Sequence, residues 1–379
     1  MKPAREVDSR AMPTSVSLVA LGLLLAAPAA AYQGPVPVDS LYPVGFRVYR
    51  IPDPSRPFQL GREAGEGARP IQVYSWYPAA ESCREPMGWG DVVRWVGVEG
   101  GHEPLDAMHA EAGRDEFVDW IGSLEGDTIA ARRALRFPLR ACEDAAAARG
   151  RHPLVLFSAG RDDSPATHAL LGEELASRGW AVFATGGLGA RERAMEFGAA
   201  DLEAQVQDLG AMASLAESLD FVDPSRPAVV GYSFGGGVAV LYSMADTTVS
   251  AVVSLDGSIG FADRVPVYVA VPGWRPERMR APVLHLRAPE EARMTNPPAG
   301  STRMRKDLSA LESLAAPVRV ETVPRAVHRD FSDLGPISAH GLAVPAIGLD
   351  DSDGDEIHAG ILAATVAFLM EHRPPSGEE

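Results

Sequence analysis

The sequence predicts an α/β fold in which a mostly parallel central sheet is covered by helices on both faces. From residue 153 onward, short and continuously apolar runs alternate with longer helical segments. Strands that alternate with helices at this spacing form a parallel sheet between two helical layers. Before residue 80 the pattern differs, because two segments alternate between polar and apolar residues. Those segments predict an antiparallel strand pair at the N-terminal end of the sheet.

The N-terminal strands are expected at 45–49 and 71–77, on either side of a turn-rich segment at 52–70. Residues 84–150 are charged, rich in alanine and helical in pattern, and the segment is too short to hold a large core of its own. We therefore expect a helical insertion between strands and not a second domain. Four aromatic residues of the insertion either cap an apolar pocket or anchor the segment to the core: Trp89, Trp95, Phe117 and Trp120.

The remaining elements follow the α/β pattern, beginning with the apolar run at 153–157 that is typical of a buried parallel strand. Further strands are predicted at 180–184, 227–231, 249–255, 282–286 and 318–323. Helices are predicted between and after them, at 168–178, 199–219, 235–245, 303–314 and 357–372.

The N-terminus has the pattern of a targeting segment. Three basic residues precede an apolar stretch at about 16–27, and a run of small residues follows it. This pattern predicts a signal peptide over 1–31, cleaved near Ala31 and Tyr32. An uncleaved anchor or a buried helix is the alternative, but the stretch is short for a bilayer span. We expect a secreted or periplasmic protein whose mature domain is 32–379, with no integral membrane segment after cleavage.

Export changes the interpretation of the only two cysteines, Cys83 and Cys142. An oxidising compartment permits a disulfide between them. The bond would close a loop of roughly 60 residues and contribute on the order of 4 kcal/mol in the chain-entropy model. Two unpaired cysteines that act as small apolar residues are the alternative, because sequence does not show how closely they approach.

The net charge and the length indicate which partners and how many domains to expect. The 379 residues carry a formal net charge of -16, which argues against binding to nucleic acid or to anionic membrane surfaces. The length fits one large α/β domain. An acidic run at 350–356 lacks the ligand spacing of an EF-hand, so we expect a solvated loop there and no metal site.

The chemistry-bearing motif is Gly-Tyr-Ser-Phe-Gly at 231–235, which joins a predicted strand to a predicted helix. A nucleophilic serine in such a fold stands on a sharp turn at the carboxyl end of a central strand. The flanking glycines let neighbouring backbone pass closely, and the following helix directs its amide dipoles at a developing oxyanion. Ser233 is therefore the candidate nucleophile, against the alternative of a glycine-rich turn with an incidental serine.

A serine hydroxyl needs a histidine base, and the histidine needs a carboxylate that orients it. His328 follows the last predicted strand, where the base of this arrangement belongs. His285 lies within a predicted strand and is expected to be a core residue. Four other histidines fall in segments predicted to be at the surface: His102, His109, His340 and His358.

The position of the acid is open from the residues alone. Asp256 ends one predicted strand and lies 23 residues after Ser233. Glu290 and Glu291 follow the next strand, where many enzymes with this chain order carry their acid.

The stretch from about 153 to 335 resembles the platelet-activating-factor acetylhydrolase branch of the α/β-hydrolases and related secreted bacterial esterases of the dienelactone-hydrolase-like kind. The residues that carry the resemblance are Pro153–Gly160, Leu175–Val182, Gly231–Gly236, Leu255–Asp256 and Val327–Asp333, with Asp53–Pro57 and Trp76–Ala79 before them. It implies the α/β-hydrolase fold from about residue 45 onward. It also favours Asp256 over Glu290 as the acid, because in that branch the acid follows the strand after the nucleophile's helix.

The fold implies an oxyanion hole of two backbone N–H groups, those of Phe234 and Arg161. This chain departs from the family at Ala159, where a histidine usually precedes Gly160. In the family, that histidine is expected to buttress the loop. Its absence here bears on how rigid the loop is, and not on the two backbone N–H donors.

The resemblance implies a hydrolase that cleaves small-molecule or lipid carboxylic esters through an acyl-enzyme and needs no cofactor. The same triad also serves peptidases and amidases, and a polyester or lipid hydrolase would differ only at the mouth of the pocket. A secreted binding protein that keeps the fold without catalysis is the third alternative. An intact set of serine, histidine and acid argues against that last reading. The sequence does not fix the oligomeric state.

Overall fold

The computed structural model describes residues 41–60, 65–125, 128–289, 305–339 and 354–374. Contacts along the chain divide it into two compact units, 1–31 and 32–379, and every described residue belongs to the second. The predicted signal peptide therefore lies outside the described residues. Within the described ranges, no helix is long and apolar enough to cross a membrane.

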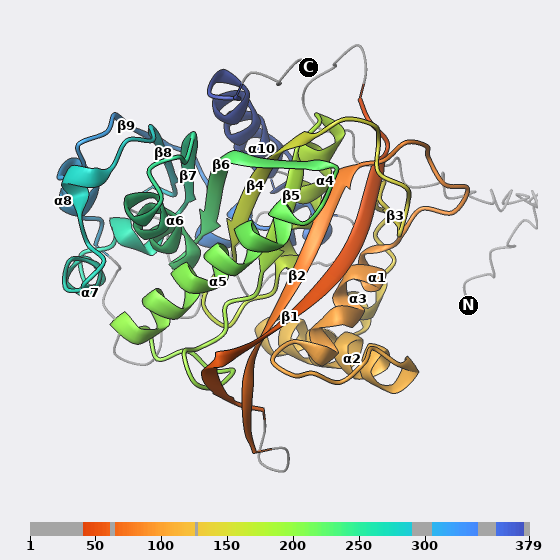
Figure 1. Cartoon of the computed structure of the whole chain (residues 1–379). Helices are drawn as coiled ribbons and strands as arrows, with labels where there is room; N and C mark the ends of the chain where they lie inside the picture. Colours follow the sequence, from red (N-terminus) through yellow and green to blue (C-terminus); the bar gives the residue numbers. More distant parts are fainter. Residues whose placement is uncertain (1–40, 61–64, 126–127, 290–304, 340–353, 375–379) are drawn as a thin grey trace, which may run out of the picture. The chain divides into compact units, whose positions relative to one another are not determined.

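The described residues form one nine-stranded sheet with the order β3-β1-β2-β5-β4-β6-β7-β8-β9 (Figure 1). β1 and β2 pair antiparallel, as do β2 and β5, and every neighbouring pair from β5 to β9 is parallel. The prediction of a mostly parallel sheet with an N-terminal antiparallel pair is confirmed. The strands are β1 Val44–Gln59, β2 Glu66–Pro78, β3 Cys142–Glu143, β4 His152–Ser158, β5 Ala181–Thr185, β6 Val222–Tyr232, β7 Ala251–Leu255, β8 Val283–Arg287 and β9 Val318–Thr322.

Helices cover both faces of the sheet, with α5 and α6 on one side and α4 and α10 on the other (Figure 1). Alternate residues of β4 supply the two cores, because successive side chains of a strand point to opposite faces. Val155 and Phe157 lie in one apolar cluster, and Leu154 and Leu156 lie in the other. The helices are α1 Trp89–Val93, α2 Ala107–Glu125, α3 Thr128–Ala134, α4 Ala169–Ser177, α5 Ala199–Glu217, α6 Phe234–Ala245, α7 Val265–Val269, α8 Ser309–Glu312, α9 Leu334–Ala339 and α10 Gly354–Glu371.

The prediction of a turn-rich segment at 52–70 is wrong, because β1 and β2 continue through most of it. Their pairing extends to Gln59 and Glu66, with a register shift between Asp53 and Pro57. A proline has no N–H to give to a ladder and is therefore tolerated at a bulge or on an edge strand. The prolines of this segment mark a bulged hairpin and not a loop.

Helices α1, α2 and α3 lie between β2 and β3, in the segment expected to be an insertion. Trp89 and Phe117 are buried in the larger apolar cluster, with their ring centroids 4.7 Å apart. The Trp89 indole also donates a hydrogen bond of 2.6 Å to the carbonyl oxygen of Ala166. These two aromatics anchor the segment to the core, whereas Trp120 is 40% exposed.

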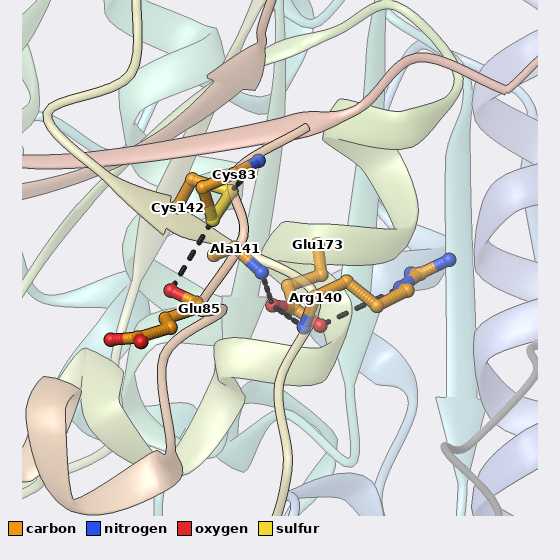
Figure 2. The surroundings of a disulfide bond; sticks show 6 residues. All are labelled: Cys83, Glu85, Arg140, Ala141, Cys142 and Glu173. Carbon is orange, nitrogen blue, oxygen red and sulfur yellow. Dashed lines mark hydrogen bonds and ion pairs between the residues drawn. A yellow bond between two sulfur atoms is a disulfide. The ribbon is translucent and has the colours of Figure 1, made fainter. Parts of the chain in front are cut away.

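A disulfide joins Cys83 to Cys142, with the Cα atoms 5.8 Å apart (Figure 2). The predicted pairing is confirmed. The bond ties the chain just before α1 to the short strand β3, which pairs with β1 at the edge of the sheet. Beside it, a carboxylate oxygen of Glu173 in α4 accepts hydrogen bonds from the backbone N–H groups of Arg140 and Ala141, at 2.7 and 2.6 Å (Figure 2). Both ends of the helical segment are therefore held to the sheet layer.

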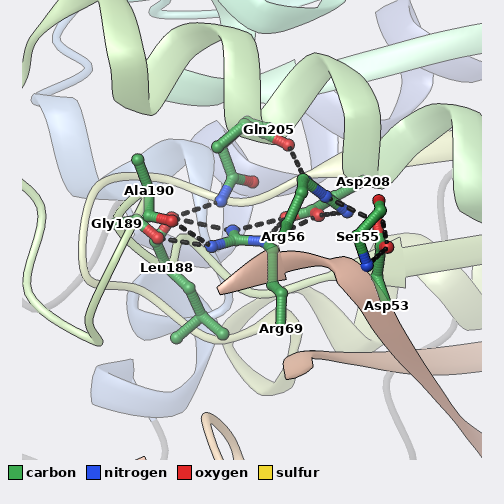
Figure 3. A network of polar contacts seen from close by, with 10 residues as sticks. Asp53, Ser55, Arg56, Arg69, Leu188, Gly189, Ala190, Gln205 and Asp208 are labelled. Atoms are coloured by element: carbon green, nitrogen blue, oxygen red, sulfur yellow. Dashed lines mark hydrogen bonds and ion pairs between the residues drawn. The ribbon is translucent and has the colours of Figure 1, made fainter. Parts of the chain in front are cut away.

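A buried ion pair fastens the β1–β2 hairpin to the helix layer and to the loop after β5 (Figure 3). The fully buried Arg69 guanidinium donates to both carboxylate oxygens of Asp208 in α5, with its Nη2 2.6 Å from Oδ2. Arg56 also contacts Asp208, at 2.8 Å. The remaining donors of Arg69 bind the carbonyl oxygens of Leu188 and Gly189. A buried charge requires such partners, so the loop after β5 is fixed by the hairpin.

Two further predictions need correction. The helix expected at 303–314 is limited to Ser309–Glu312 within the described residues. Just before it, Lys306 forms an isolated bridge with Phe261 and Asp307 donates its backbone N–H to the carbonyl oxygen of Gly260, so this backbone pairs with another segment and not within a helix. His358 is not at the surface. It lies in α10 with 1% of its surface exposed, and its ring nitrogen Nδ1 contacts the carbonyl oxygen of Asp330 at 2.9 Å.

We predict that replacing both cysteines (Cys83→Ser with Cys142→Ser) lowers the free energy of unfolding by about 4 kcal/mol, because the bond restricts a loop of roughly 60 residues in the unfolded chain. Urea unfolding of the variant and the oxidised wild type measures the difference. Wild-type protein treated with a reductant is the matched control and should lose the same amount. Equal stability of the variant and the oxidised wild type would contradict the prediction.

Candidate active site

Ser233 stands on a sharp turn between β6 and α6. Its backbone angles are φ 53° and ψ -115°, in a region that L-residues rarely adopt. The backbone of the turn is held on both sides, because Ser233 N–H donates to the carbonyl oxygen of Leu255 and its own carbonyl accepts from the N–H of Ser258. The neighbouring strand β7 therefore imposes the conformation that presents the hydroxyl.

The glycines on either side of Ser233 are required by close backbone packing. A Cβ atom added to Gly235 would overlap with the carbonyl oxygen of Ser158, at the end of β4. A Cβ atom added to Gly231 would overlap with the carbonyl oxygen of Gly235. The motif thus lets three chain segments meet behind the serine, as the sequence pattern predicts.

His328 follows β9 and begins a short 3₁₀ helix, His328–Phe331. Its ring is stacked on the Tyr232 ring at 4.9 Å between centroids, and the Tyr232 hydroxyl donates to the His328 carbonyl oxygen at 3.2 Å. The Asp330 carboxylate caps this turn through the backbone N–H of Val327, at 2.7 Å. The imidazole is therefore held from both its ring face and its backbone.

Asp256 lies directly after β7, with 2% of its side chain exposed. Burial alone would raise the pKa of this carboxyl, but the hydrogen bond and charge of His328 and the charge of Lys306 hold the pKa well below its ordinary value. One carboxylate oxygen, Oδ1, accepts from the backbone N–H of Ala288 at 3.0 Å and from Lys306 Nζ at 2.7 Å. The other, Oδ2, faces His328.

The structure brings Ser233, His328 and Asp256 into one hydrogen-bonded chain. Ser233 Oγ lies 2.9 Å from His328 Nε2, and His328 Nδ1 lies 2.7 Å from Asp256 Oδ2. The ionised carboxylate can only accept, so the imidazole carries its proton on Nδ1 and leaves Nε2 to accept from the hydroxyl. This arrangement has the geometry that a serine nucleophile, a histidine base and an orienting acid require.

The two amides expected to form an oxyanion hole follow the ends of β4 and β6, which are parallel neighbours in the sheet. Phe234 is the first residue of α6, and its amide directly follows the serine. Gly160 approaches the serine closely, because a Cβ built on it would lie 3.4 Å from Ser233 Cβ. Arg161 is the next residue in the chain, with a side chain that is 51% exposed. Within the described residues, neither amide is engaged in a backbone hydrogen bond outside the helices and strands.

The loop after β4 is held by the loop after β5. Asp162 N–H donates to the carbonyl oxygen of Gly187 at 3.1 Å, and Gly187 N–H donates to the carbonyl oxygen of Asp163 at 2.9 Å. The Asp162 carboxylate also accepts from the backbone N–H of Met195 at 2.8 Å. Since Arg69 fixes the carbonyls at Leu188 and the residue after it, the hairpin and both loops form one connected unit.

Glu99 provides a second support that the sequence did not suggest. It lies at the end of the 3₁₀ segment Arg94–Val98 and accepts hydrogen bonds from Ser164 Oγ at 2.6 Å and from the Tyr74 hydroxyl. Ser164 lies three residues beyond Arg161. Burial raises the pKa of Glu99 to about 7, against the lowering effect of these two hydroxyl donors. A buried carboxyl from the helical segment thus supports the loop after β4 at Ser164.

The remaining positions singled out from the sequence are a core histidine, two alternative acids and an acidic run. His285 is a core residue, as expected, with 1% exposure and its Nδ1 3.0 Å from Ser254 Oγ. Glu290 and Glu291, the alternative acids, lie outside the described residues. Most of the acidic run at 350–356 also lies outside them, and the described part of the chain contains no group of three or more side chains suited to hold a metal ion.

No protein-family model matches the sequence, and no curated protein matches it. A ferulic acid esterase from Streptomyces cinnamoneus matches in structure with a TM-score of 0.60 and 23% identity, over 93% of this chain and 95% of that protein. A dienelactone hydrolase from Anabaena variabilis matches with a TM-score of 0.38 and 17% identity, over 59% of this chain and 88% of its own. The first likeness and the sheet order show that the chain has the α/β-hydrolase fold.

We predict that Glu99→Gln stabilises the protein at alkaline pH relative to wild type. In the unfolded chain this carboxyl ionises near its ordinary value of 4.5, whereas in the folded protein its pKa is about 7. The wild type therefore loses stability as pH rises through this window, by at most about 3 kcal/mol, and a glutamine does not. Urea unfolding at about pH 5 and about pH 8 measures the change.

Glu321→Gln is the matched control, because the Glu321 side chain is 44% exposed and pairs with Arg319 at the surface. Its difference from wild type should be small and the same at both pH values. A Glu99→Gln variant whose difference from wild type does not change with pH would contradict the prediction.

Proposed function

We propose that the chain is a serine hydrolase that cleaves carboxylic esters, with Ser233 as nucleophile, His328 as general base and Asp256 as the orienting acid. The observation that carries the proposal is the unbroken hydrogen-bond chain from Ser233 Oγ through both ring nitrogens of His328 to Asp256 Oδ2, at 2.9 and 2.7 Å. The hydroxyl lies on a strained turn that its neighbours impose, which is the condition a nucleophile elbow needs.

In the first step, Ser233 Oγ attacks the ester carbonyl carbon while His328 Nε2 takes the hydroxyl proton. The buried carboxylate of Asp256 stabilises the imidazolium that forms and holds the ring in the tautomer that accepts at Nε2. The carbonyl oxygen becomes an oxyanion, which the amides of Phe234 and Arg161 bind. Each such donor contributes a few kcal/mol to lowering the barrier.

In the second step, the tetrahedral intermediate collapses, the carbon–oxygen bond to the alcohol breaks, and His328 gives its proton to the departing oxygen. Water then attacks the acyl carbon while His328 takes a proton from it. The bond from that carbon to Ser233 Oγ breaks, His328 returns the proton to Oγ, and the carboxylic acid product leaves. The mechanism uses side chains and backbone amides of this chain only.

The preference for esters over amides follows the resemblance to secreted esterases, and the Streptomyces protein with the same fold is named an esterase. The His328 side chain is 27% exposed, so a substrate can reach the reacting atoms from solvent. We also propose that the protein is exported. The disulfide between Cys83 and Cys142 supports this, because such bonds persist in oxidising compartments.

We predict that Ser233→Ala abolishes turnover of p-nitrophenyl esters, with a loss of at least about 10⁴-fold in kcat/KM, because the attacking atom is removed. A fluorophosphonate probe should label the wild type and fail to label the variant. Ser243→Ala is the matched control, because this buried serine of α6 donates to the carbonyl oxygen of Ala239 within its own helix. Circular dichroism checks that each variant is folded. Full activity of a folded Ser233→Ala variant would rule out the assignment.

A second prediction separates the candidate acids. Asp256→Asn should lower kcat/KM by about 10³–10⁴-fold, because an amide can donate to Nδ1 and favour the wrong tautomer. A double variant, Glu290→Gln with Glu291→Gln, should stay within a few-fold of wild type. The opposite ranking of the two variants in ester hydrolysis would assign the acid to the later segment.

A further inference from the structure

Lys306 is an unusual residue for this chain. Only two of the 35 basic residues are lysines, Lys2 and Lys306, and all the others are arginines. Lys306 is also buried, with 8% of its side chain exposed. The mechanism above gives it no part, although its ammonium touches the acid of the proposed triad.

The Asp256 carboxylate is shared between two side chains. Lys306 Nζ lies 2.7 Å from Oδ1, and His328 Nδ1 lies at the same distance from Oδ2. Phe261 lines the same space, with Lys306 Nζ 4.0 Å from its ring centroid and the His328 ring 6.2 Å away in edge contact. The ammonium is therefore held by an aromatic face and by the carboxylate oxygen other than the one that faces His328.

We propose that Lys306 is a positioning residue that sets the pH range of catalysis, by sharing the Asp256 carboxylate with His328. The inference rests on the proposed function of these two residues. Its ammonium contacts the acid, so it acts on the histidine through that carboxylate.

The electrostatic argument has two parts, and both act in the same direction. A carboxylate that is paired with an ammonium stabilises the imidazolium less than a carboxylate that faces the imidazole alone. The ammonium also repels the imidazolium across the buried acid, where water screens the charges poorly. We therefore expect catalysis to extend to lower pH with Lys306 than without it.

The same pairing keeps the acid in its reactive form. Asp256 is almost fully buried, which disfavours its charge, and the ammonium of Lys306 offsets that cost. The lysine supplies its charge as a compact ammonium that hydrogen-bonds to one carboxylate oxygen.

Other titratable groups face this site and remain the same when Lys306 is changed. On the acid side these are His285 of β8 and Tyr232 of β6, which interact electrostatically with Asp256. On the histidine side, Asp163 of the loop after β4 interacts with the imidazole. Further charged groups lie on the elements packed nearby: Arg287, Arg329 and Asp330. The expected effect is therefore a change relative to wild type and not an absolute value.

The experiment measures kcat/KM for p-nitrophenyl acetate from about pH 4 to about pH 9 in wild type and Lys306→Met. Removing the ammonium should move the midpoint of the acidic limb upward by about one pH unit. Below that midpoint the variant should be up to about tenfold slower than wild type, and on the plateau it should stay within about threefold. Lys306→Arg keeps the charge, and its limb should lie within about 0.3 units of wild type.

Arg305→Met is the matched control, because it removes one positive charge from the adjacent, exposed residue. Its acidic limb should coincide with that of wild type, since exposed charges are screened by solvent and salt. Lys306→Gln is a second uncharged variant, used if the methionine variant does not fold.

A proton NMR titration of the His328 ring gives a readout that does not need activity. Its midpoint should rise by the same amount in Lys306→Met, in both the Ser233 and the Ser233→Ala background. An unchanged acidic limb and ring titration, or a loss of activity that is equal at every pH, would overturn the proposal and leave Lys306 as a structural anchor. A wild type that neither hydrolyses esters nor reacts with a fluorophosphonate would instead refute the proposed function, and the ring titration would still test the pairing.

Discussion

The close approach of three backbone segments behind Ser233 is the constraint on which the rest of the site depends. The end of β4, the end of β6 and the start of α6 meet so tightly that neither Gly231 nor Gly235 has room for a Cβ atom. The turn between them is therefore narrow, and Ser233 adopts a positive φ that its backbone partners on the β7 side maintain. This strained conformation is maintained because β6 is paired with a parallel strand on each side.

The other two residues of the proposed triad lie at the same edge of the sheet. Parallel strands all end at one edge, so Asp256 after β7 and His328 after β9 reach the space beside the serine without a long detour of the chain. A fully buried carboxylate at this place is costly unless each of its oxygens is satisfied. Asp256 meets that condition with a backbone N–H, an imidazole and an ammonium. The lysine thus belongs to the electrostatics of the site as well as to its packing.

Support for the loop after β4 comes from segments far away in the sequence. Glu99 reaches Ser164 from the helical segment that the disulfide closes at its base, and Arg69 reaches the loop after β5 from the N-terminal hairpin. Both side chains are almost completely buried and make several hydrogen bonds each. The helical segment and the N-terminal hairpin, which carry no residue of the proposed triad, therefore support the backbone beside Ser233.

The sequence by itself determined the alternation of strands and helices, the antiparallel pair at the start, and the placement of Ser233 and His328 after strands, because hydrophobic periodicity and a strand–Gly-x-Ser-x-Gly–helix junction are local signals. It left the acid open between Asp256 and the later glutamates. It also missed the bulged hairpin, whose prolines look like turn residues when the partner strand is not considered. Only the tertiary structure decided that Asp256 faces the imidazole, that His358 is buried, and that Glu99 and Lys306 support the site. Those contacts join residues 28 to 72 positions apart, and no local pattern encodes which distant side chain satisfies a buried charge.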